Sequence, residues 1–243
     1  MTHASRAGMR VRVPLLAIGA AAWAVLVLDP AGTTHRSAHG APTPLLAEAA
    51  LMFAAMMVPL IGAPARYVCD RSFAPRRPRA VALFTAGYAV PWMAAAALLL
   101  VAGRWIVAAE SAAVLPGALV AIGVWQCSPW KQHLLNRCHA HPELAAFGAR
   151  ADLGVLRFGF THALWCIGSC SALMVLPLLF TRGHLAVMAG VTLWIAGERL
   201  DKPMPPRWSL RGPVRIVRVT PGRARVWLKR SGKDAIVPPA PTS

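Results

Sequence analysis

Apolar residues along this chain gather in blocks of about twenty, and short polar or basic segments separate the blocks. The blocks lie at about 11–29, 45–65, 80–102, 112–129, 153–180 and 184–200. A helix needs about 20 apolar residues to cross the hydrocarbon core of a bilayer, and it satisfies its backbone groups within itself. The pattern therefore predicts an all-α, polytopic membrane protein with about six transmembrane helices.

The basic residues alternate in number from one loop to the next. Three arginines precede the first block, five lie between the second and third, three lysines or arginines lie between the fourth and fifth, and ten follow the sixth. Each loop on the opposite side holds a single arginine. By the positive-inside rule, both termini are predicted to be cytoplasmic. No small-residue cleavage site follows the first block, so we expect this helix to stay uncleaved.

The chain divides into a predicted transmembrane domain, residues 1–200, and a basic, Pro-rich cytoplasmic tail, residues 201–243. Its net charge is +17, although only 14% of its residues are charged. In a soluble protein this excess would favour nucleic-acid binding, but here the basic residues lie in loops and the tail, beside anionic lipid headgroups. We therefore expect the lipid bilayer, and no nucleic acid, as a partner. Residues 214–229 alternate apolar and basic residues around a Pro-Gly pair, which fits a hairpin on the leaflet or a solvated tail.

The fifth block contains donors that a transmembrane helix seldom carries, in the segment HALWCIGSCSALM. His162, Cys166, Cys170 and Met174 repeat every four residues, so on a helix they form one stripe, here called the sulfur stripe. Each step rises about 6 Å, and the four side chains extend over roughly 18 Å, with Cys166 near the bilayer midplane. Because metal–ligand bonds are about 2.0–2.3 Å long, one ion reaches only neighbouring members of the stripe. Another helix would have to complete the ligand shell.

The chemistry of these ligands favours soft metals. Thiolate, thioether and imidazole suit Cu(I) first, and Zn(II) through Cys and His. Hard cations such as Mg(II) need carboxylates, which the sulfur stripe lacks. A packed core is the alternative, since Cys and Met also fill helix interfaces. The ionisable His162 favours function, because such a group is costly inside lipid.

A second stripe follows the second block. Met52 and Met56 repeat at the same spacing, and Met57 follows directly. The two spans run antiparallel and Met56 lies at about the depth of Cys166, so this stripe is predicted to offer thioether ligands to the sulfur stripe. Packing is the alternative for methionines in a span. The two prolines in the second half of the block predict a kink.

The loop between the fourth and fifth blocks collects further donors, which are Cys127, His133, Cys138, His139 and His141. Their spacing differs from the paired Cys and His of a zinc finger. Cys138 and the histidines near it are compatible with a weak metal site or a hand-over point on the cytoplasmic side. The alternative is an interfacial loop that tryptophans anchor at the headgroups.

These motifs resemble a bacterial family of predicted metal-binding integral membrane proteins of unknown function, over about residues 45–202. The resemblance rests on AAMMVPLIGAP, WQCSPWKQHLLNRCHAHP and GFTHALWCIGSCSALM. It implies a metal-binding core in the bacterial inner membrane, with the sulfur stripe in the positions of the family pattern. The chain departs from that pattern at Ser169 and Leu134, where the family has cysteines, so it has fewer thiols than the resemblance implies.

The leading hypothesis is an inner-membrane protein that binds a soft metal near mid-membrane, copper before zinc. It would transfer the ion or deliver it to a membrane metalloenzyme, or exchange it with a metal chaperone. The predicted ligands are Cys166, Cys170, His162, Met174, Met56, Met57, Cys138 and His133. No Walker A motif is present, so ATP-driven pumping is not expected. Two alternatives stay open: a thiol–disulfide oxidoreductase that cycles Cys166 and Cys170, and a structural subunit without metal.

Overall fold

Helices form every regular element of the computed structural model, which describes residues 3–28, 42–108, 113–180 and 183–209. In chain order they are α1 (His3–Leu28), α3 (Pro42–Met56), η2 (Val58–Ile61), α4 (Gly62–Arg71), η3 (Ala74–Arg76), α5 (Arg77–Ala108), α6 (Val114–Cys127), α7 (Pro129–Cys138), α8 (Gly148–Leu179) and α9 (His184–Leu200). The all-α fold is therefore confirmed. The proposed hairpin at 214–229 lies outside the described residues.

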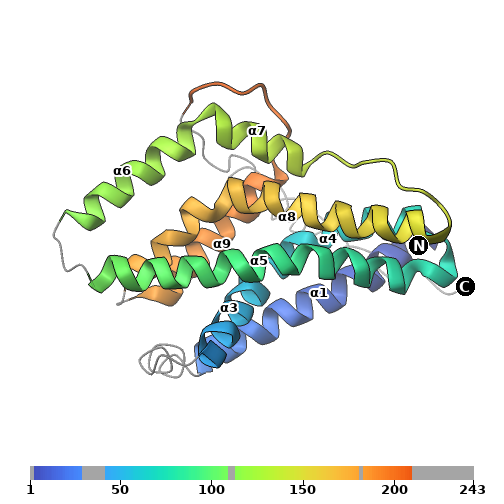
Figure 1. Cartoon of the computed structure of the whole chain (residues 1–243), viewed down its shortest axis with the longest axis horizontal. Coiled ribbons are helices and arrows are strands. Elements are labelled where there is room, and N and C mark those ends of the chain that lie inside the picture. Colours follow the sequence, from blue (N-terminus) through green and yellow to red (C-terminus); the bar gives the residue numbers. More distant parts are fainter. Residues whose placement is uncertain (1–2, 29–41, 109–112, 181–182, 210–243) are drawn as a thin grey trace, which may run out of the picture.

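Two long helices, α5 and α8, form the centre of the molecule and lie side by side (Figure 1). Glycines make their close approach possible. A Cβ atom on Gly159 of α8 would meet the backbone carbonyl of Phe84, and one on Gly87 of α5 would meet the carbonyl of Leu156. The residues around Gly159 therefore face α5 at short range, which matters for the site because the sulfur stripe begins three residues later.

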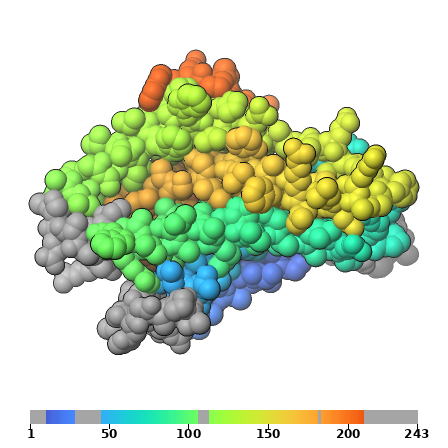
Figure 2. Space-filling model, in the orientation of Figure 1, coloured from blue at the N-terminus to red at the C-terminus, as the bar shows by residue number. Residues whose placement is uncertain are grey.

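The remaining helices cover the central pair on two sides. Helices α1, α3 and α4 pack on the side of α5, whereas α6, α7 and α9 pack against α8 (Figure 1). Residues 202–209 then lie over α7, where they form one surface of the molecule (Figure 2). The Asn136 side chain fixes this segment, because it donates a hydrogen bond to the carbonyl of Met204 at 2.7 Å. The end of α9 is thereby held beside α7.

Three of the described helices are long and apolar enough to cross a membrane, within Val11–Leu28, Ala74–Trp105 and Gly148–Leu179. A fourth span results if Leu45–Met56 and Val58–Arg71, bent by 48°, are counted together. Apolar side chains such as Leu98 and Val120 point outward, as lipid contact requires. The chain is thus a multi-pass membrane protein by these helices. Helices α6 and α9 have 14 and 17 residues, so the prediction of six spans and of cytoplasmic termini is not settled by the structure.

The bend in the second span lies where the prolines predict it. Helix α3 ends at Met56, and the 3-10 turn η2 follows with Pro59 in its first positions. Proline has no N–H to donate and its ring displaces the preceding turn, so the α-helical hydrogen bonding stops there. The close packing of α1 at Gly19 against the Pro59 ring holds the break in place. The predicted kink is confirmed.

The fourth loop, by contrast, contains a helix that the hydrophobic pattern missed. Ser128 caps α7, since its hydroxyl accepts a hydrogen bond from the Lys131 amide at 3.1 Å. Pro129 occupies the first helical position, where its missing N–H costs nothing. These signals are local and readable, but α7 has only 10 residues, and polar residues interrupt its apolar pattern. The helix turns Cys138 inward, toward α8.

Candidate metal centre

The four members of the sulfur stripe are all buried on one side of α8. Cys166, Cys170 and Met174 are each 1% exposed, and His162 is 4% exposed. Spacing of four on a helix produces this arrangement, and the glycine contact at Gly159 turns the stripe toward α5. The predicted geometry of a buried stripe is therefore present.

A matching aromatic stripe on α5 faces it, formed by Phe84, Tyr88 and Trp92, all with 0% exposure. The rings of Phe84 and Tyr88 lie 6.2 and 5.9 Å from the His162 ring, measured between centroids. The Tyr88 hydroxyl donates a hydrogen bond to the Cys166 sulfur at 3.0 Å. The Trp92 indole N–H, near the same sulfur, makes no hydrogen bond in the structure. The site thus has an aromatic wall that excludes water.

A cationic side chain reaches the same sulfur from α9. Nη2 of Arg199 lies 2.8 Å from Sγ of Cys166 and 3.4 Å from Oγ of Ser169. Cys166 therefore accepts hydrogen bonds from two donors, one of them permanently charged. Hydrogen bonds to a charged group are stronger than neutral ones, especially at low dielectric constant. The two donors would therefore stabilise Cys166 as a thiolate.

The next turn of α8 adds Cys170, whose thiol donates a hydrogen bond to the Cys166 carbonyl at 2.9 Å. The hydroxyl of Ser169 donates to the same carbonyl, also at 2.9 Å. Both bonds lie within α8, and Ser169 also accepts a hydrogen bond from Arg199 of α9. All five cysteines of the chain are free of disulfides in the structure.

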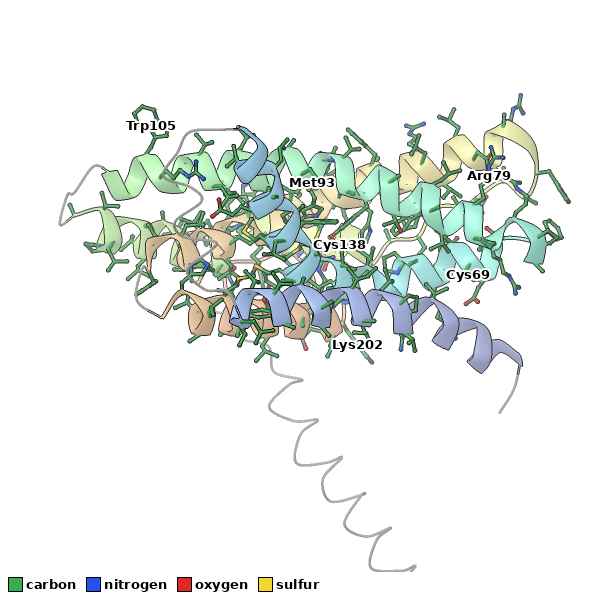
Figure 3. The ribbon with its side chains drawn as sticks, turned by 90° about the horizontal axis from the view of Figure 1, so that it is seen from below. Cys69, Arg79, Met93, Trp105, Cys138 and Lys202 are labelled. Atoms are coloured by element: carbon green, nitrogen blue, oxygen red, sulfur yellow. The ribbon has the colours of Figure 1, made fainter. Side chains whose placement is uncertain are left out.

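Cys138 approaches this group from α7. It is buried, and its thiol interacts with Ser169 and Arg199. Burial raises the pKa of the Cys138 thiol, while the nearby Arg199 acts in the opposite direction. Figure 3 shows Cys138 in the middle of the helix assembly, whereas Cys69 lies toward one end. Of the predicted loop donors, Cys138 is the one that joins the sulfur stripe.

The other predicted ligands lie elsewhere or are held differently. His133 is exposed, about 140° around α7 from Cys138. Met56 and Met57 are fully buried at the end of α3, and α3 packs on α1 and α5. Among the described residues, no three His, Cys, Asp or Glu side chains are grouped closely enough to hold a metal ion. That Met56, Met57 and His133 act as metal ligands therefore stays a prediction.

A buried ion pair fixes the end of α9 that carries Arg199. Nζ of Lys131 lies 2.5 Å from Oε1 of Glu198, and the side chains of Gln126 and Trp194 each donate to that oxygen at 2.9 Å. Burial lowers the pKa of Lys131, while Glu198 acts in the opposite direction. Because breaking such a pair leaves an uncompensated buried charge, it holds α9 firmly against the α6–α7 junction.

A cavity of about 270 Å³ opens beside the first member of the sulfur stripe. Arg137, His141, Thr161, His162 and Trp165 contribute to its lining. Nδ1 of His162 is buried without a hydrogen-bond partner. The cavity gives the protein surface a path to His162, which lies one turn from Cys166.

Sequence reasoning missed two parts of this site, the aromatic stripe and Arg199. Phe84, Tyr88 and Trp92 carry the same four-residue spacing as the sulfur stripe, and that signal was available in the sequence. Arg199 follows the last apolar block, where a basic residue is ordinary for topology. Only the packing of α9 against α8 reveals its role.

These features define a helical membrane protein with a buried pair of cysteines, Cys166 and Cys170, here called the sulfur centre. Thiolates are ligands that suit soft metals. A family model described as "PpoB2: Copper chaperone" matches residues 47–217, more than two thirds of the chain. The chain belongs to this family of copper chaperones, and copper, the metal predicted first, is the ion that the family implies. No curated protein and no solved structure matches the chain.

Proposed function

We propose that this protein holds Cu(I) at Cys166 and Cys170 and delivers it to a copper-requiring partner at the membrane. The observation that carries the proposal is the setting of Cys166. Its buried sulfur accepts hydrogen bonds from Tyr88 and Arg199, and a second thiol lies one helical turn away. Soft thiolate ligands in a dry site favour Cu(I) over harder ions.

The two cysteines supply the primary ligands in this proposal. Metals bind the thiolate, so Cys170 gives up its hydrogen bond to the Cys166 carbonyl and releases its thiol proton to solvent when the sulfur turns to the ion. A Cu(I) ion accepts as few as two ligands, so the absence of a larger donor group among the described residues suits it better than Zn(II). Cys138, His162 and Met174 border the pair and offer further ligands during transfer.

Access is proposed to run through the cavity beside His162. His141 lies at the exposed side of this cavity, where its ring packs on Tyr67 at 4.5 Å between centroids. Tyr67 also donates a hydrogen bond to the Pro142 carbonyl at 2.7 Å, which fixes this connection between α7 and α8. An ion that enters here meets the His162 imidazole before the Cys166 sulfur. We place the protein in a bacterial cytoplasmic membrane with this connection on the basic, cytoplasmic side.

Cu(I) titration of the purified full chain tests the proposal, with a chromophoric competitor under anaerobic conditions. We expect one tightly bound Cu(I) in the wild type and its loss in the Cys166→Ala/Cys170→Ala variant. Cys69→Ala is the matched control, because Cys69 is also buried but lies in α4, away from the site. A wild type that binds no Cu(I), or a double variant that binds it as tightly, contradicts the proposal. The oxidoreductase alternative instead predicts a reversible Cys166–Cys170 disulfide without copper, which thiol counting detects.

A further inference from the structure

We propose that Arg199 makes the sulfur centre selective for monovalent ions, so that Cu(I) is accepted and divalent ions such as Zn(II) and Cd(II) are rejected. The inference rests on the proposed function and adds to it a residue that determines specificity. It follows from the count of charges around Cys166, since soft ligands alone do not distinguish Cu(I) from Cd(II).

Arg199 brings a permanent positive charge into the site. A guanidinium is not deprotonated in proteins, and this one contacts the Cys166 sulfur at 2.8 Å. Its Nε atom is buried and makes no hydrogen bond. Arg199 as a whole is half-buried, so its charge is held beside the sulfur and only partly in contact with water.

No carboxylate neutralises this charge within the part of the chain that the structure describes. The nearest candidate in sequence is Glu198, but its Oε1 already accepts from Lys131, Gln126 and Trp194. The other ion pairs of the described residues join Arg66 with Asp70, Arg76 and Arg79 with Asp152, and Arg104 with Glu48. The counter-charge of Arg199 must therefore come from the sulfur atoms.

The charge count then differs between the two kinds of ion. Two thiolates carry two negative charges, so Cu(I) leaves one, and Arg199 neutralises it. A divalent ion neutralises both thiolates by itself, and Arg199 remains as an uncompensated, half-buried cation beside it. A cation that is partly withdrawn from water and has no partner is unfavourable, because water screens its charge less than in bulk solvent. Arg199 thus penalises divalent ions without touching them.

Metal titrations of Arg199→Gln and Arg199→Lys test this inference. The Gln variant removes the charge but keeps a hydrogen-bond donor, so its affinity for Cd(II) and Zn(II) should rise relative to Cu(I) by about tenfold or more. The Lys variant keeps the charge and should keep the wild-type ratio. Arg79→Gln is the matched control, because Arg79 is an exposed arginine that pairs with Asp152 toward one end of the molecule, away from Cys138 (Figure 3), and should leave the ratio unchanged.

A second pair of variants avoids removal of Arg199 and covers the case in which that removal disturbs folding. Ser169→Asp places a carboxylate next to Arg199 and should shift the ratio toward divalent ions, whereas the neutral Ser169→Asn should not. Circular dichroism and gel filtration confirm that each variant is folded. Cu(I) binding by the wild type with an unchanged ratio in both Arg199→Gln and Ser169→Asp overturns the selectivity proposal alone. A wild type that binds no Cu(I) removes the proposed function as well.

Discussion

At the scale of single residues, the environment of Cys166 explains more than the number of thiols does. One sulfur accepts from a phenol of α5 and a guanidinium of α9, while its neighbour Cys170 bonds to a carbonyl of its own helix. Two cysteines with the same burial therefore have different partners. The charged contact is the stronger one, so Cys166 is the anchor of the pair and Cys170 the ligand that turns to meet the ion.

Ser169 offers a direct test of this centre, because it lies between Arg199 and Cys138 and is 2% exposed. Ser169→Cys adds a fourth thiol beside Cys166, Cys170 and Cys138, at a position where the family that the motifs resemble has a cysteine. We expect Cu(I) affinity to rise roughly tenfold, the scale on which single changes around a metal site act. A competitive Cu(I) titration measures it, with Ser72→Cys as control, since Ser72 follows α4 and its hydroxyl donates to the Val68 carbonyl. Equal affinity in Ser169→Cys and the wild type contradicts this reading of the site.

At the scale of helices, the approach of α5 to α8 determines whether the aromatic and sulfur stripes meet. Gly159 allows this approach, because a methyl group there would collide with the Phe84 carbonyl and lie 3.0 Å from the Tyr88 amide nitrogen. Backbone atoms cannot move aside as a flexible side chain does. The distance between these helices therefore fixes the Tyr88–Cys166 hydrogen bond.

Gly159→Ala should destabilise the protein by about 1–3 kcal/mol, as overpacking does in a tight interface. It should also weaken Cu(I) binding, because α5 moves away with Tyr88. Gly190→Ala on α9 is the control, since its added methyl group meets no atom within 4 Å. Thermal denaturation in one detergent compares the two variants. A Gly159→Ala protein as stable as Gly190→Ala would show that the helices are not in close contact.

The helices themselves follow from the sequence more readily than their contacts do. Apolar blocks predict α5 and α8, and the prolines predict the break after Met56, because both signals are local. The sulfur stripe is likewise readable from spacing alone. Which residues face it is not readable in this way, since Arg199 and Cys138 reach Cys166 from helices far along the chain. Their proximity depends on packing, to which the buried Lys131–Glu198 pair contributes.

At the scale of the whole molecule, a chaperone must both shield its ion and release it. The aromatic stripe, α7 and α9 enclose the sulfur centre, and the cavity at His162 leads toward the surface. Affinity and access are thus located in different parts of the structure. Residues of the cavity should influence the rate of loading, and residues of the centre should influence the equilibrium.

His141→Ala tests this separation, because His141 lines the exposed side of the cavity without touching Cys166. We expect Cu(I) loading to slow several-fold while the equilibrium affinity stays at the wild-type value. The reason is that the His141 imidazole binds the entering ion transiently and is not a ligand in the loaded protein. Stopped-flow mixing with a Cu(I)–competitor complex measures the rate, and the endpoint of the same trace gives the affinity. His184→Ala is the control, because His184 begins α9 and lies outside the cavity lining. If both variants load at the wild-type rate, the ion reaches Cys166 by another path, whereas a change in affinity alone would make His141 a ligand of the centre.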